Sequence, residues 1–291
     1  MNLLRFVALQ DCKGYSVFRQ GPDKFVKSSA INSGYNRTMG FLLIIPVILG
    51  WLSGWIVNYV ADVLPTSKSF SRPVCYACQT RYDWSDYLFF RNCSNCGKRR
   101  TVRTLLVQAV MVVAPALIWI FPNQTLPFPV ALILLIYLAT VLVIDLEYRL
   151  ILHPVSIIGA VLGLGIGIFL RSKNSLTYGI SSTLLGGAAG FGVMLVFYFA
   201  GELFVKRMSK KRGMSADEVA LGFGDVNLSG ILGLLLGWQA IFVSLFFAIL
   251  VGGLVSLVII LGMLIAKKYK AFTAIPYAPF LILSALYFLY F

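Results

Sequence analysis

The sequence predicts an all-α, polytopic membrane protein of about eight transmembrane helices with a small four-cysteine, zinc-binding insertion. Of the 291 residues, 59% are hydrophobic and 12% are charged, whereas an average soluble domain carries about 25% charged residues. A soluble monomer of this composition would expose large apolar patches, so that class is excluded. Apolar runs recur along the chain, and two Cys-x-x-Cys pairs share the polar segment between the first two runs.

Seven apolar runs have about 17 residues or more, which is enough to cross a bilayer as a helix. They cover 41–64, 104–121, 128–144, 151–170, 178–205, 241–266 and 272–291. A shorter run follows an acidic residue at 226–238 and is interpreted as a short, deep or tilted helix. The alternative is seven spans with this run as a re-entrant segment. Helical periodicity does not decide between eight and seven spans, because helices that are buried on all sides are apolar on all sides.

The positive charges predict the orientation of these helices. The net charge is +14, and sixteen of the 25 basic residues lie in three segments: 66–103, the stretch after Val205, and 267–270. With eight helices, these segments fall on one side, which the positive-inside rule makes cytoplasmic. The basic excess is therefore interpreted as a topology signal, and no nucleic-acid partner is expected. The partner expected for the apolar runs is the lipid bilayer.

Residues 1–38 fit this topology poorly. They carry a net charge of +4 on the side predicted to be external, and they lack the apolar run of a signal peptide. Our hypothesis is that they form a poorly ordered basic extension and that Met39 opens the functional chain. The expected organisation is then a first transmembrane helix at 39–65, a cytoplasmic four-cysteine segment at 66–103, and a multi-helix membrane core at 104–291.

The four cysteines of the polar segment have the spacing of a metal site. Cys75 and Cys78 form one Cys-x-x-Cys pair, and Cys93 and Cys96 form the second. Two such turns supply four thiolates for tetrahedral zinc, and neighbouring basic residues favour the thiolate form. Disulfides or a redox pair are the alternatives, and the predicted cytoplasmic side argues against disulfides. Because four protein ligands leave no open position, the expected zinc is structural.

Acidic residues are scarce, and two of them lie where apolar helices begin or end. Asp145 follows an apolar run in Val143-Ile144-Asp145, and Asp225 follows Gly222-Phe223-Gly224 just before the short run. Ionisable groups at membrane depth are costly and are functional candidates by default. In the predicted topology both lie at the cytoplasmic boundary, so helices far apart in sequence can bring them together.

A pair of facing carboxyl groups suits hydrolysis without a metal. Two such groups cannot both ionise cheaply, so one acts as a base towards water while the other donates a proton. The simpler interpretation is that each Asp is a solvated residue at a helix end, with Asp225 as an N-cap. His153 is the only histidine, which disfavours a histidine metal cluster or a Ser-His triad in the main site.

Taken in order, the motifs resemble those of the type IV prepilin peptidases, the bacterial membrane enzymes also called prepilin leader peptidase/N-methyltransferases. The likeness covers about residues 40–291. Its motifs are Gly50-x-x-Ser53-Gly54-x-x-x-Asn58 ending in Leu64-Pro65, the paired Cys-x-x-Cys, Ile144-Asp145-Leu146 with a downstream Pro154, the run from Glu218 through Gly222-Phe223-Gly224-Asp225 to Val226, and Ile275-Pro276-Tyr277-Ala278-Pro279-Phe280.

The resemblance implies that Asp145 and Asp225 form the catalytic dyad of an aspartic endopeptidase. It also implies a substrate, the basic leader of type IV prepilins and pseudopilins, which is cut at the cytoplasmic face of the bacterial inner membrane. Many family members then methylate the new N-terminus with S-adenosylmethionine. The family often has Lys two places after the second Asp, where this chain has Asn227, and this departure weakens the expectation of methylation more than that of proteolysis.

Two other classes remain alternatives. A proton- or ion-coupled transporter would place acids at mid-membrane on several helices and would show a repeat in hydropathy. A non-catalytic component of pilus or secretion assembly would use the zinc segment as a docking surface. The absence of a convincing repeat and the position of the acids at one face favour the peptidase.

Overall fold

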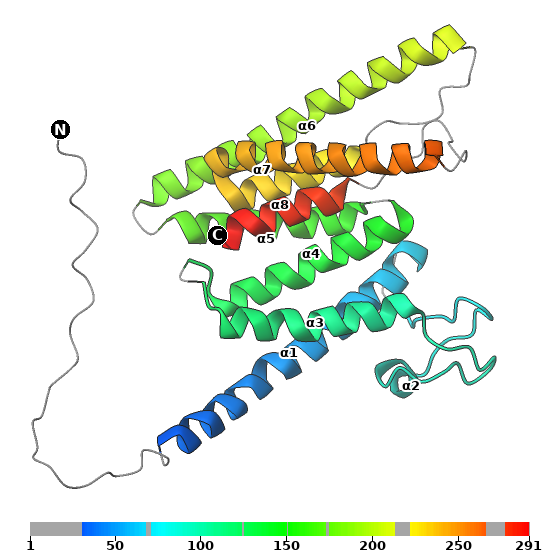
Figure 1. Cartoon of the computed structure of the whole chain (residues 1–291), viewed down its shortest axis with the longest axis vertical. Coiled ribbons are helices and arrows are strands. Elements are labelled where there is room, and N and C mark those ends of the chain that lie inside the picture. Colours follow the sequence, from blue (N-terminus) through cyan, green and yellow to red (C-terminus); the bar gives the residue numbers. More distant parts are fainter. Residues whose placement is uncertain are drawn as a thin grey trace, which may run out of the picture. The chain divides into compact units, whose positions relative to one another are not determined.

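The computed structural model describes residues 31–67, 71–123, 125–149, 151–172, 175–212, 222–265 and 277–290. Within these ranges the secondary structure is helical apart from one isolated bridge between Val74 and Arg81. The prediction of an all-α protein is therefore confirmed. Figure 1 labels the eight described helices. They are α1 (Ile31–Ser67), α2 (Trp84–Leu88), α3 (Val102–Ile120), α4 (Phe128–Tyr148), α5 (His153–Arg171), α6 (Leu176–Arg212), α7 (Phe223–Ile265) and α8 (Ala278–Tyr290).

Residues 1–42 and 43–291 form two compact units, and the second holds the membrane core. The proposed basic extension, residues 1–38, lies almost wholly outside the described residues and stays a prediction. Among the residues that the structure describes, six helices have the length and composition to cross a bilayer. They are α3, α4, α5 and α7, together with 43–67 of α1 and 176–207 of α6. Helix α8 is apolar but has only 13 residues. The structure thus confirms a polytopic membrane protein.

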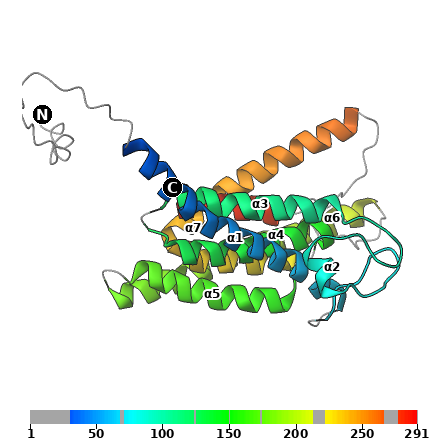
Figure 2. The ribbon, with the colours of Figure 1, turned by 90° about the horizontal axis from the view of Figure 1, so that it is seen from below.

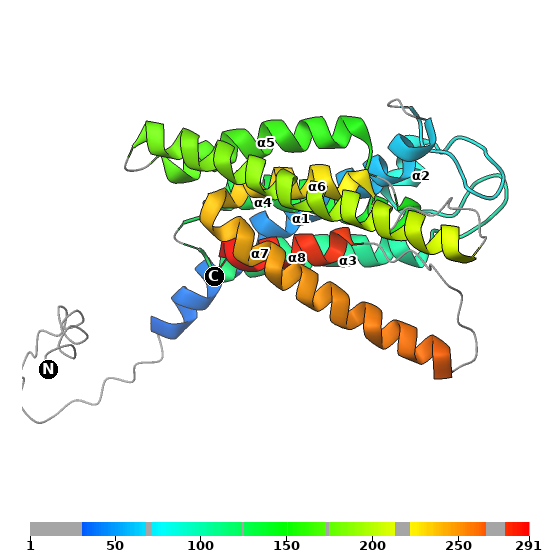
Figure 3. The same cartoon turned by 90° about the horizontal axis from the view of Figure 1, so that it is seen from above.

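Helix α7 contains two of the predicted helices. Gly237 has non-helical backbone angles (φ 79°, ψ 172°) and divides α7 after Leu236. The two halves run in opposite directions in Figure 3. The first half corresponds to the short run predicted at 226–238, and the second to the run at 241–266. A residue with positive φ is strained unless it is glycine. The glycine at position 237 therefore allows the chain to reverse here without strain.

The break in α7 leaves helix-end carbonyl groups that a bilayer cannot hydrate, and Arg171 satisfies them. This side chain, at the C-terminus of α5, donates hydrogen bonds to the carbonyl oxygens of Leu234 (3.2 Å) and Leu235. It also donates to the Thr183 hydroxyl at 2.9 Å. A cation near the C-terminus of a helix also interacts favourably with the helix dipole. Arg171 therefore closes the end of the first half of α7.

The first half of α7 is the most enclosed segment of the membrane core. Leu228, Leu232 and Leu235 are almost completely buried. They pack in one cluster with apolar residues of α4 and α8, including Leu138 and Ile282. By contrast, most large side chains of the second half of α7 are exposed in this structure, as expected for a helix that faces lipid. The glycine-rich stretch of α6 packs closely on the enclosed half, since the Ser229 hydroxyl donates to the Gly190 carbonyl at 2.9 Å.

Polar side chains join α1 to α3. The Asn58 amide donates to the Thr104 carbonyl at 3.2 Å, and the Gln108 amide donates to the Trp51 carbonyl at 2.9 Å. The cysteine segment, which contains α2, lies beside the C-terminal end of α1 and the start of α3 (Figure 2). Neighbouring aromatic rings from α1 and the cysteine segment have centroid separations of 5.7–6.4 Å; these rings are Trp55, Tyr59, Trp84 and Tyr87.

We expect Arg171→Met to destabilise the folded protein, because the carbonyl groups at the break in α7 would lose a charged donor. Hydrogen bonds to charged groups contribute about 1.5–3 kcal/mol each, so a fall of several degrees in the midpoint of thermal unfolding in detergent is expected. The matched control is Arg207→Met, at an exposed position of α6. Equal midpoints for the two variants would contradict the capping role.

Candidate active site

Asp145 lies in the last turn of α4 with its side chain inside the protein. Its residue is only 5% exposed. Helix α4 ends because Arg149 adopts the left-handed conformation (φ 52°, ψ 39°), and the Arg149 N–H donates to the Asp145 carbonyl at 2.8 Å. The carboxyl oxygen Oδ2 is buried and makes no hydrogen bond within the described part of the chain. The end of α4 thus presents a carboxyl group that is buried by packing and has an oxygen without a hydrogen-bond partner among the described residues.

Asp225 lies in the first turn of α7, at the start of the enclosed half-helix. It is 8% exposed, and its N–H donates to the Gly222 carbonyl at 3.0 Å. A side chain at position 224 would clash with its neighbours, since a Cβ built there would lie 2.9 Å from the Ile151 Cβ. The second glycine of Gly222-Phe223-Gly224-Asp225 therefore lets α7 approach the link between α4 and α5 closely.

The structure brings these two aspartates to one cavity of about 480 Å³. Three parts of the chain line it: the C-terminal end of α1, the link from α4 to α5, and the start of α7. The lining residues are Leu64, Pro65, Asp145, Arg149, Ile151, Leu152, His153, Pro154, Gly222, Phe223, Gly224, Asp225 and Asn227. Most of these side chains are apolar, and the two carboxyl groups are the only acidic groups among them.

Two further polar residues of this cavity were not singled out as site residues by sequence reasoning. Arg149 adds a cation one turn after Asp145, and His153 opens α5 on the same cavity. The signal for Arg149 was its position four residues after Asp145 at the end of an apolar helix. His153, the only histidine in the sequence, served there only to disfavour a histidine metal cluster or a Ser-His triad, and nothing in the sequence indicates that it lines this cavity. Asn227, the departure from the family pattern, also lines it.

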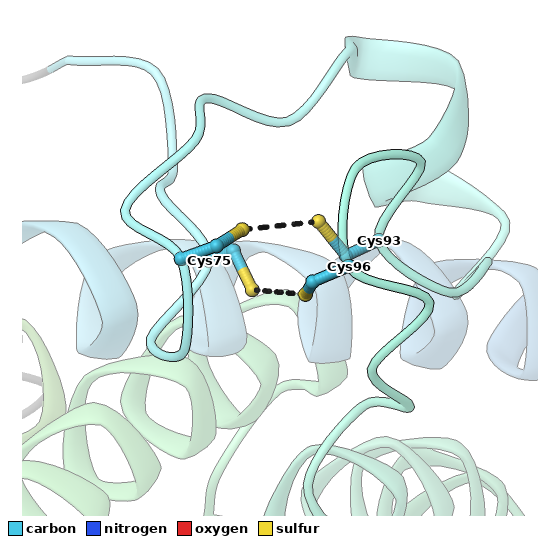
Figure 4. Close-up of side chains that lie close together, drawn as sticks. Cys75, Cys93 and Cys96 are labelled. Atoms are coloured by element: carbon cyan, nitrogen blue, oxygen red, sulfur yellow. Dashed lines mark hydrogen bonds between the residues drawn. The ribbon is translucent and has the colours of Figure 1, made fainter.

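The four cysteines converge in a second site, outside the membrane helices. All four Sγ atoms lie within 4.8 Å of one another. Cys75 and Cys96 are separated by 3.7 Å between Sγ atoms, and Cys78 and Cys93 by 3.6 Å (Figure 4). Four thiolates at about 2.3 Å from a tetrahedral zinc would be about 3.8 Å apart. The cysteines are therefore positioned to bind a metal ion of this kind.

The two Cys-x-x-Cys pairs fold in the same way. In the first, the Gln79 N–H donates to the Cys75 carbonyl at 2.8 Å; in the second, the Gly97 N–H donates to the Cys93 carbonyl at 2.8 Å. Both donor residues have positive φ, 58° and 66°. Such repeated tight turns aim two thiols from each pair at one point.

Hydrogen bonds prepare at least two of these thiols to bind a cation. The side chain and backbone of Thr80 lower the pKa of the Cys78 thiol to about 6. Burial acts to raise the pKa of the Cys75 thiol, but hydrogen bonds from the backbone and from the Tyr82 hydroxyl outweigh it, so that this pKa is also lowered. A thiolate is the form that binds metal, so both effects favour a metal site.

Taken together, these observations define a class: a polytopic helical membrane protein in which two aspartates line one cavity and four cysteines are positioned to bind a metal ion. Comparison with known proteins then shows what the chain is similar to. Residues 132–257 match the type IV leader peptidase family, which confirms the resemblance seen in the sequence. The matched stretch includes both Asp145 and Asp225.

Curated relatives support the same family. The chain is 27% identical over 106 residues to the prepilin leader peptidase/N-methyltransferase of Aeromonas hydrophila, covering 36% of this chain and 35% of the relative. It is 29% identical over 105 residues to the protein of the same name from Aeromonas salmonicida, covering 36% of this chain and 31% of the relative. The chain thus matches about a third of the length of these relatives. No solved structure matches it.

We expect the purified protein to hold one metal ion per chain and to lose it when Cys75 and Cys93 are both replaced by Ser. Each substitution removes one ligand from a different pair, which leaves too few thiolates for a tetrahedral site. Elemental analysis measures the metal content. Cys12→Ser is the matched control, because Cys12 is the one cysteine outside the two pairs. Unchanged metal content in the double variant would refute the site.

Proposed function

We propose that the chain is a membrane aspartic endopeptidase that removes the leader peptide of type IV prepilins or pseudopilins, with Asp145 and Asp225 as its catalytic dyad. The observation that carries the proposal is the cavity that these two buried carboxyl groups share, at the meeting of three segments that are distant in sequence. The match to the type IV leader peptidase family over residues 132–257 supports the same assignment.

The chemistry follows from two carboxyl groups in one apolar cavity. Because both cannot ionise cheaply at close range, one stays charged and the other keeps its proton. The charged carboxylate takes a proton from water as the water oxygen attacks the scissile carbonyl carbon, while the protonated carboxyl group donates to the carbonyl oxygen. Breaking the C–N bond then sends a proton to the leaving amine, and no covalent enzyme intermediate forms.

The position of the cavity suits a substrate that is part membrane helix and part soluble leader. Asp145 lies at the C-terminal end of α4 and Asp225 at the N-terminal end of α7. A scissile bond just outside an apolar helix would reach this level while the helix remains in lipid. By the positive-inside rule we place this end of the molecule, together with the cysteine segment, on the cytoplasmic side of the bacterial inner membrane.

We further propose that the metal of the four-cysteine site is zinc with a structural role. Four thiolates satisfy its tetrahedral geometry and leave no position for substrate or water. The names of the Aeromonas relatives include N-methyltransferase activity. For this chain we propose methylation of the new N-terminus with S-adenosylmethionine as a second step, without assigning residues to it.

We expect Asp145→Asn and Asp225→Asn each to abolish cleavage of a prepilin substrate in membranes. An amide cannot accept a proton from water or hold the shared proton, so activity should fall by at least about 10²-fold. The measurement is conversion of a co-expressed prepilin to its shorter form, followed by mass. Glu202→Gln, which alters an exposed carboxylate on α6, is the matched control. Normal cleavage by either Asn variant would contradict the assignment of Asp145 and Asp225 as the catalytic dyad.

We expect zinc binding to weaken as the pH falls, because protons compete with the metal for the thiolates. The lowered pKa of Cys78, about 6, means that this thiol stays largely deprotonated at neutral pH and takes up a proton below that value. Dialysis from about pH 7 to about pH 5 in the presence of a chelator should therefore release the metal. Full retention of zinc at the lower pH would contradict this assignment of the ligands.

A further inference from the structure

One carboxylate of α1, that of Asp62, binds side chains from both the cysteine segment and α3. The Tyr87 hydroxyl donates to Asp62 Oδ2 at 2.7 Å, and Arg100 approaches the same oxygen at 3.8 Å. Arg103, at the start of α3, forms an ion pair with Asp62 Oδ1. The two oxygens of one side chain therefore serve partners from the cysteine segment and from α3.

The contacts of Tyr87 continue towards the metal ligands. Arg100 stacks over two rings, at 4.0 Å from the centroid of Tyr87 and 4.6 Å from that of Tyr82. The Tyr82 hydroxyl in turn hydrogen-bonds to the thiol of Cys75. Tyr87 is only 1% exposed, so this side chain is fixed by packing on all sides. The order of these rings depends on the fold of the two Cys-x-x-Cys turns around them.

In the other direction, Arg103 reaches the helix that bears the first aspartate of the cavity. While one terminal nitrogen contacts Asp62, the other lies 2.5 Å from the Glu147 carboxylate. Glu147 is two residues after Asp145, in the last turn of α4 before the left-handed Arg149. Arg103 therefore holds together α1, α3 and the end of α4, and its guanidinium group has the planar, forked geometry that suits two carboxylates.

We propose that the metal-bound cysteine segment sets the position of the Asp145 carboxyl group through Asp62, Arg103 and Glu147, which makes Arg103 a positioning residue for the peptidase site. This proposal rests on the proposed function, since it concerns the geometry of the same dyad. It assigns the metal site a task beyond local folding: without metal, Tyr87 and Arg100 lose their order, Asp62 loses two partners, and the end of α4 is no longer held.

The proposed positioning role of Arg103 does not depend on a large contribution of its ion pairs to the stability of the fold. Arg103 is 23% exposed at its side chain and Glu147 41%, and partly exposed ion pairs contribute little to stability. Displacement of a catalytic group by about 1 Å, however, can cost about 10²-fold in rate. The network is therefore expected to affect turnover while leaving the fold intact.

The test compares Arg103→Gln and Glu147→Gln with wild type in a prepilin cleavage assay. We expect kcat to fall about 5- to 30-fold in each variant, in line with the usual size of coupling through networks, with KM and metal content nearly unchanged. Arg103→Lys, which keeps the charge but loses the fork, should be intermediate. The matched controls are Arg99→Gln at an exposed position and Glu202→Gln at a half-buried position, which make the same chemical changes outside the network.

A second readout does not depend on activity. Hydrogen–deuterium exchange of the backbone amides at 142–149 should speed up in Arg103→Gln and, equally, in wild-type protein stripped of metal. In the stripped protein, Arg103→Gln should add nothing further. Additive effects of metal removal and Arg103→Gln, or unchanged exchange at 142–149, would overturn the proposal. If the exchange behaves as expected but Asp145→Asn still cleaves, the positioning network stands and the proposed function fails instead.

Discussion

One constraint shapes the described core: two carboxyl groups that are 80 residues apart in sequence line the same cavity. Neither group can be moved there cheaply, because burial in an apolar surrounding opposes charge. Each is therefore carried by a helix that is held by its neighbours. Helix α4 supplies Asp145 from its last turn, and the first half of α7 supplies Asp225 from its first turn.

The broken helix shows how this placement is achieved inside lipid. A continuous α7 would pass through the bilayer and would lack the reversal seen at Gly237. Breaking it leaves an enclosed half-helix that begins at the cavity, and the exposed carbonyl groups at the break must then be satisfied from within the protein. Arg171 does this from the end of α5. The half-helix thus has a polar side chain at each end, Asp225 at the cavity and the half-buried Arg171 at the break.

Much of this could be predicted from the sequence, because the bilayer imposes simple rules on length and charge. The apolar runs predicted α3, α4 and α5 to within about four residues, whereas α1 begins ten residues before its run and α6 ends seven residues after it. The spacing of Cys75, Cys78, Cys93 and Cys96 predicted their convergence. The two runs predicted at 226–238 and 241–266 already implied a reversal between them, but its position at Gly237 was not predicted, since that glycine resembles many others in the apolar runs. Arg149 and His153 were missed as cavity residues because their place depends on how the link between α4 and α5 folds, which periodicity does not report.

The polar contacts between distant segments were the hardest feature to predict from the sequence, and the role that we propose for the cysteine segment depends on them. Asp62 looked like one interruption of an apolar helix, and Arg103 like one of many topology-marking cations. In the structure each has several partners at once. An ion pair shared by three helices costs desolvation and adds little stability, but it fixes an angle between them. The dyad that we propose takes its two acids from separate helices, so it would need such angles held constant. The cysteine segment, with the metal that we propose for it, is a compact way to hold them.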